Sequence, residues 1–149
     1  MNDVDRFIQA QDGGAYAQAL AELTAGAKRS HWIWFVFPQL AGLGNSPMAR
    51  MYGIQGVDEA TGYLRHPVLR ERLLEAMNAV RSQSSTTLRR LMGSEIDALK
   101  LVSSMTLFRE IGRRLHDDEV ETAAADILNS AQAEGFSACE FTMRQIRQA

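Results

Sequence analysis

Three polar residues stand together in an otherwise apolar part of the chain, where a charge is costly to bury. Lys100, Ser103 and Ser104 lie within residues 97–108, and most of their neighbours are Leu, Val, Met or Phe. Successive residues of a helix advance by about 100°, so these three side chains share one helical face. An ammonium group beside two hydroxyls offers the hydrogen-bond donors that hold an anionic or polar ligand.

Three interpretations of this group are open. In the first, Lys100 pairs with Asp97 and the serines donate hydrogen bonds back to helix carbonyls, so that all three polar groups are paired within the helix and bind no ligand. In the second, the group binds a ligand. In the third, a serine is a nucleophile activated by a desolvated lysine. The known Ser-x-x-Lys order is reversed here, and no oxyanion hole can be named.

A second unusual segment, residues 28–46, combines basic and aromatic side chains. Residues 32–37 hold two tryptophans and two phenylalanines, although the whole chain is only 7% aromatic. Such a cluster forms either the centre of a core or the wall of a pocket. We therefore predict a ligand pocket between residues 28–46 and residues 97–108. Its expected lining residues are Lys28, Arg29, His31, Trp32, Trp34, Gln39, Lys100, Ser103 and Ser104.

The lining residues have different expected roles. Lys28, Arg29, His31 and Lys100 would supply positive or switchable charge, and the two tryptophans an aromatic wall for a planar ring. Gln39 and the two serines would supply hydrogen bonds. This combination suits a phosphorylated or nucleotide-like small molecule, which the protein would bind and, in one version of the hypothesis, hydrolyse. The alternative is a non-catalytic helical module for interaction or structure, in which both segments are only core and capping.

The elements that must position these residues are helices. Apolar residues recur at helical spacing through most of the chain, and the best-marked helix is expected at residues 94–115, with Ser94 as its cap. The first half of this helix is apolar on nearly all sides, so the helix should lie in the middle of the domain. We predict an all-α single domain over residues 1–149, a compact bundle of about eight helices around this central helix. Residues 32–37 have the composition of a strand but no partner strand, which favours a buried helical turn.

Composition narrows the class of protein. The chain has 149 residues and a formal net charge of −2, which fits a single globular domain and disfavours a nucleic-acid partner. No apolar run approaches the ~20 residues of a membrane span, and the acidic start does not resemble a secretion signal. Cys139 is the only cysteine, and no histidine has a second ligand at metal spacing, so we expect no disulfide, metal or cofactor. We expect a cytoplasmic protein; its oligomeric state, and whether it is an enzyme, stay open.

The two unusual segments also carry a family resemblance. Residues 28–35 with 38–40 and 42–44, and residues 99–101 with 103–108, resemble the bacterial family of the domain of unknown function eighteen-ten, some members of which carry the label calpastatin. The resemblance covers about the first 110 residues and continues more loosely to the end. It implies a compact all-helical single domain and a helical turn at residues 32–37, but no established activity.

Overall fold

The computed structural model describes residues 3–149; Met1 and Asn2, which the predicted domain includes, lie outside the described residues. The described part is all-helical, as predicted, and has ten helices instead of about eight, because several are only one or two turns long. In chain order they are α1 (Asp5–Gln11), α2 (Ala15–Ala25), α3 (Ile33–Val36), α4 (Pro47–Tyr52), α5 (Val57–Arg65), α6 (Pro67–Arg81), α7 (Leu88–Met92), α8 (Glu95–Arg114), α9 (Asp118–Ala133) and α10 (Glu140–Arg147).

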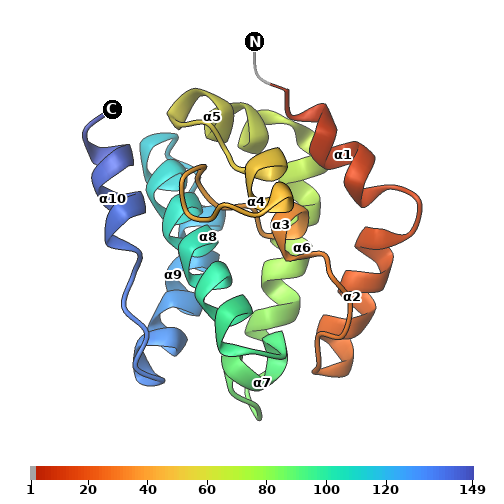
Figure 1. The fold of residues 1–149 in the computed structure, drawn as a ribbon. Coiled ribbons are helices and arrows are strands. Elements are labelled where there is room, and N and C mark those ends of the chain that lie inside the picture. Colours follow the sequence, from red (N-terminus) through yellow and green to blue (C-terminus); the bar gives the residue numbers. More distant parts are fainter. Residues whose placement is uncertain (1–2) are drawn as a thin grey trace.

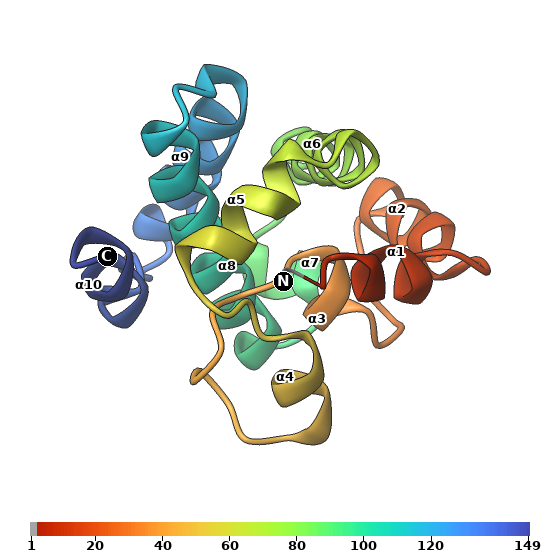
Figure 2. The ribbon, with the colours of Figure 1, turned by 90° about the horizontal axis from the view of Figure 1, so that it is seen from above.

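Helix α8 occupies the middle of the fold, as its apolar surface predicts. It packs against α9, α10, α7, α5 and α3, and Figure 1 shows α10 on one side of it and α1 and α2 on the other. Seen from above, α6 and α9 lie behind α8, and α4 with the loop before it lies in front (Figure 2). No helix within residues 3–149 is long and apolar enough to cross a membrane.

The ends of α8 are set by local chemistry. The Ser94 hydroxyl accepts a hydrogen bond from the Asp97 N–H at 3.1 Å, which confirms the predicted cap. Acidic residues in the first turn and Arg113 and Arg114 in the last complement the helix dipole. The helix ends where His116 takes a left-handed φ of 56°, and the Asp117 N–H returns to the Gly112 carbonyl at 2.8 Å.

A line of aromatic rings connects three helices through the core. The ring of Tyr63 on α5 lies 5.2 Å from that of Phe7 on α1 and 5.3 Å from that of Phe108 on α8. All three side chains are fully buried. Because offset or edge-on ring pairs add to the free energy gained from burial alone, this line joins the first helix to the central one.

Residues 32–37 form a helical turn, α3, as predicted. Its buried side chains are Ile33, Phe35 and Val36. The chain that follows makes one isolated parallel bridge between Leu40 and Ile54, the only β-type pairing among the described residues. In this bridge the Ala41 N–H donates to the Ile54 carbonyl and the Ile54 N–H donates to the Gln39 carbonyl, both at 2.9 Å.

The chain between α2 and α3 is fastened to the end of α7. The Lys28 N–H donates to the Leu91 carbonyl at 2.7 Å. Gly93, which ends α7, has a φ of 83°, and a Cβ atom there would lie 2.9 Å from the Lys28 carbonyl oxygen. A glycine at this position therefore lets Lys28 approach the start of α8 closely.

We expect Gly93→Ala to lower the free energy of unfolding by about 2–5 kcal/mol, because the left-handed φ costs about 1–2 kcal/mol and the clash with Lys28 adds to it. Gly13→Ala is the matched control, since Gly13 has a similar φ of 78° and nothing within 4 Å of the added Cβ. Urea denaturation of both variants measures the difference. Equal losses would show that the approach of Lys28 to Gly93 is unimportant.

Candidate functional site

The carboxylate of Glu22 organises the chain that leads into the site. Glu22 lies on α2, is buried, and accepts hydrogen bonds from the backbone N–H groups of Arg29 and Ser30 at 2.7 and 2.9 Å. It also accepts from the Ser30 hydroxyl at 2.5 Å, the Trp32 indole N–H at 2.9 Å and the Gln18 amide at 2.8 Å. The chain from Arg29 to Trp32 is therefore wrapped around one buried negative charge.

These donors change how Glu22 titrates. Burial alone disfavours the charged form and raises the pKa of Glu22. The hydrogen bonds from the Ser30 side chain, the Arg29 backbone and the Gln18 side chain outweigh burial, so its pKa lies well below the ordinary value of 4.5. Glu22 is thus a structural anion, charged throughout the physiological pH range.

Lys28 is fully engaged inside the protein. Its Nζ atom lies 2.8 Å from Asp97 Oδ2 and donates to the Ser30 carbonyl at 2.6 Å. It also lies 5.0 Å from the centre of a Trp32 ring, and only 5% of the side chain is exposed. This ammonium joins the segment after α2 to the first turn of α8.

Lys100 shares the same carboxylate but is held much more loosely. Its Nζ atom is 3.7 Å from Asp97 Oδ1, and no described residue accepts a hydrogen bond from it. It lies 5.5 Å from the centre of a Trp34 ring, and 23% of the side chain is exposed. The first interpretation of Lys100, a pairing with Asp97, is therefore present only as a long ion pair.

The two serines of the predicted group differ in their surroundings. Ser103 is half-buried and Ser104 fully buried. The Ser104 hydroxyl and the indole N–H of Trp34 are shielded from solvent, and neither has a hydrogen-bond partner among the described residues. The back-bonding predicted for the serines is made instead by Thr106, whose hydroxyl donates to the Val102 carbonyl at 2.8 Å.

The remaining predicted residues are distributed around this cluster. Arg29 and His31 are exposed, and Arg29 contacts Glu22 through its backbone N–H. Gln39 is buried, and its carbonyl accepts from the Ile54 N–H at 2.9 Å. Trp32 is 1% exposed, so it belongs to the core, whereas Trp34 is half-buried.

The structure therefore brings together Lys28, Lys100 and both tryptophans around Asp97. No group of three or more His, Cys, Asp or Glu side chains in residues 3–149 has the arrangement of a metal site. The chemistry available at the cluster is electrostatic and aromatic: two ammonium groups, one shared carboxylate and a half-buried indole ring.

The comparisons with known proteins agree with the resemblance seen in the sequence. Residues 1–134 match the family described as protein of unknown function (DUF1810). The chain belongs to this family. The match spans both α3 and α8, so the whole of the Asp97 cluster lies within the family region.

One solved structure is similar to nearly the full chain. The chain is similar to the conserved hypothetical protein Rv1873 from Mycobacterium tuberculosis, with 38% sequence identity and a TM-score of 0.79. The similarity covers 97% of this chain and 96% of that one. No match was found among curated proteins.

The most connected residue of this site, Glu22, is not among the residues predicted from the sequence. It lies in an Ala-rich helix. A signal was present, because Glu22 falls between Ala19 and Leu23 on the inward face of α2. An acidic residue on an apolar face requires donors from elsewhere in the fold, and here they come from residues 29–32.

We expect Glu22→Gln to lower the free energy of unfolding by about 1.5–3 kcal/mol at pH 7, because an amide cannot accept from all of these donors. Because the pKa of Glu22 is lowered in the folded protein, its ionised form stabilises the fold fully above about pH 4.5. This stabilisation is lost as the pH falls below that value. The variant should therefore lose less stability than the wild type between pH 6 and about pH 3.

Urea denaturation at several pH values measures this difference, with Glu71→Gln, at an exposed glutamate, as the control. The control should keep the wild-type pH dependence. If Glu22→Gln has the same pH dependence as the control, the ionised form of Glu22 does not stabilise the fold.

Proposed function

We propose that the protein binds a phosphorylated or nucleotide-like small molecule between residues 28–46 and residues 97–108. The ligand would contact the surface formed by α3 and the first half of α8. Its anionic group would lie at Lys100 and Ser103, and its planar ring would lie against Trp34.

The charge balance around Asp97 is the observation that supports this proposal most strongly. Two ammonium groups share one carboxylate, and Lys28 takes the short contact of 2.8 Å while Lys100 keeps a contact of 3.7 Å. The Lys100 ammonium therefore keeps an uncompensated share of positive charge at a partly exposed position. An anion bound there would gain a charge-assisted hydrogen bond that no described residue now provides.

The neighbouring surface suits the rest of such a ligand. Lys100 lies over the half-buried Trp34 ring, and Ile96 and Leu99 on the same face of α8 are 66% and 48% exposed. Exposed apolar side chains beside a cation and an indole provide contact area for a planar ring. The indole N–H of the same Trp34 ring is buried without a partner among the described residues, which costs free energy.

The proposal is one of binding and does not include hydrolysis. No described residue hydrogen-bonds to the hydroxyl of Ser103 or of Ser104, so neither serine has the adjacent base that activates a nucleophile. The non-catalytic module is the second candidate. It is favoured by the complete burial of Trp32 and by the saturated contacts of Lys28.

The test is a thermal-shift and calorimetric titration with adenosine monophosphate, ribose 5-phosphate and inorganic phosphate. A ligand at about 100 times its Kd should stabilise the wild type by about 2.7 kcal/mol. We expect Lys100→Ala to weaken the binding of adenosine monophosphate by about tenfold or more. Trp34→Leu should weaken the binding of adenosine monophosphate more than that of ribose 5-phosphate, because only adenosine monophosphate has an aromatic ring.

Arg90→Ala is the matched control, since Arg90 is an exposed cation on α7 outside the site. It should leave the affinity unchanged. The non-catalytic module would be the better description if no probe stabilises the wild type. An equal loss of affinity in the Arg90 and Lys100 variants would mean that binding depends only on the overall charge of the protein.

A further inference from the structure

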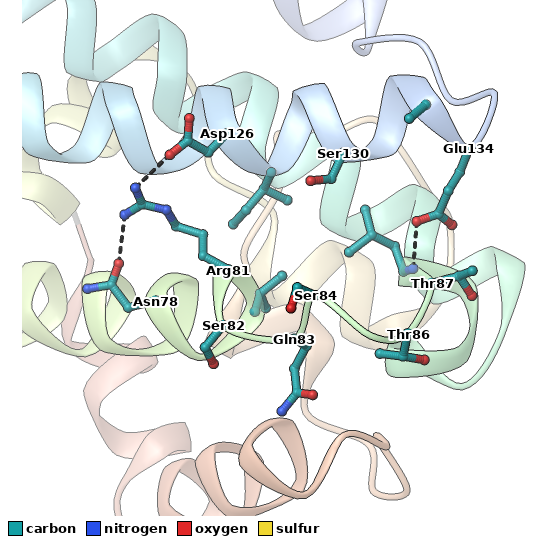
Figure 3. Close-up of a pocket in the computed structure, with 14 residues that line it drawn as sticks. Asn78, Arg81, Ser82, Gln83, Ser84, Thr86, Thr87, Asp126, Ser130 and Glu134 are labelled. Atoms are coloured by element: carbon teal, nitrogen blue, oxygen red, sulfur yellow. Dashed lines mark hydrogen bonds and ion pairs between the residues drawn. The ribbon is translucent and has the colours of Figure 1, made fainter.

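A cavity lies between the end of α6, the loop at residues 82–87 and α9 (Figure 3). Its volume is about 760 Å³, within the range of small-molecule sites. It shares no lining residue with the nine residues of the predicted pocket. Sequence analysis did not assign any function to the loop.

One face of α9 supplies a row of polar groups to the cavity. Asp126, Ser130 and Glu134 are spaced four residues apart, so they lie on one side of the helix, and Figure 3 shows the row facing the loop. Asp126 is paired with Arg81 at 2.6 Å. This pair closes one end of the row.

Glu134 stands at the other end, and only one oxygen of its carboxylate accepts a hydrogen bond. Its Oε2 atom accepts the Leu88 N–H at 2.8 Å, which fixes the side chain at the start of α7. Its Oε1 atom is shielded from solvent and has no hydrogen-bond partner among residues 3–149. This oxygen has a long ion pair with Arg89 Nη1 at 3.9 Å, and the Nε and Nη2 atoms of Arg89 contact Glu95.

The loop contributes hydroxyl groups that the fold does not use. No described residue hydrogen-bonds to the hydroxyls of Ser84, Thr86 or Ser130. By contrast, the Ser82 hydroxyl donates to the Ala79 carbonyl at the end of α6, and the Thr87 hydroxyl accepts from the Arg90 N–H at the start of α7. Each free hydroxyl can both donate and accept, which is the pattern that matches the hydroxyls of a polyol.

The remaining lining is apolar and the charge balance is negative. Val80, Leu88 and Ile127 are buried side chains that also line the cavity. They offer a surface for the C–H groups of a small ring. The charged lining residues are Arg81, Asp126 and Glu134, a set with one net negative charge that disfavours a phosphate, and Arg89 lies outside the lining, 3.9 Å from Glu134 Oε1.

We propose that this cavity binds an unphosphorylated polyol that carries an amine, the chemical class of the amino sugars. The amine would lie toward Glu134, the hydroxyls toward Ser84, Thr86 and Ser130, and the ring over the apolar side chains. This site is separate from the proposed anion site at Lys100, and its lining charge has the opposite sign.

Calorimetric titration with glucosamine at about pH 6.5, where the amine is protonated, tests the proposal. Glucose lacks the amine and should bind about tenfold more weakly or worse; glucosamine 6-phosphate adds a negative charge and should do the same. Two substitutions on α9 locate the site. Ser130→Leu fills the cavity and should abolish the binding of glucosamine, whereas Asn129→Leu, at the adjacent exposed residue outside the cavity, should leave it unchanged.

Glu134→Gln keeps an oxygen to accept the Leu88 N–H but removes the charge. It should reduce the affinity for glucosamine to that for glucose and leave the glucose affinity unchanged, with the melting temperature recorded to show that the fold is intact. The proposal is overturned if glucosamine does not bind the wild type. It is equally overturned if Asn129→Leu weakens binding as much as Ser130→Leu, or if Glu134→Gln weakens both sugars alike.

Discussion

The buried carboxylate of Glu22 is the constraint on which the site depends. A charge taken out of water must be surrounded by donors, and here the donors are the backbone and side chains of residues 29–32 together with Gln18. Satisfying Glu22 turns the chain after α2 back on itself and brings the Trp32 indole into the core. A single polar requirement thus fixes the conformation of a segment that has no regular secondary structure of its own.

The position of Lys28 follows from this turn. Its carbonyl lies against Gly93 and its N–H binds Leu91, so its ammonium reaches the first turn of α8 and pairs with Asp97. Asp97 makes its short contact with Lys28 through Oδ2 and faces Lys100 through Oδ1 at 3.7 Å. The positive charge of Lys100, which supports our proposed function, therefore depends on how Lys28 packs against α7. The two lysines are linked through the Asp97 carboxylate that they share.

The fold offers surfaces of opposite character on two sides of its central pair of helices. At the start of α8, a lysine, a half-buried tryptophan and exposed apolar side chains favour an anion with a planar ring. On α9, a row of acceptors and free hydroxyls around an apolar floor favours an amine-bearing polyol. Helices α8 and α9 pack along each other, so both surfaces are held by the same rigid pair. The DUF1810 match includes both.

The sequence alone determined the all-helical class, the central helix with its Ser94 cap and the shared face of Lys100 and Ser103, because periodicity and capping depend on residues within about one turn of each other. It also predicted that residues 32–37 are helical. Only the tertiary structure decided which carboxylate each lysine meets, which of the two serines is buried, and that Glu22 binds residues 29–32. It likewise created the cavity beside α9. Such contacts join distant residues, and no local pattern specifies a partner that lies on another helix.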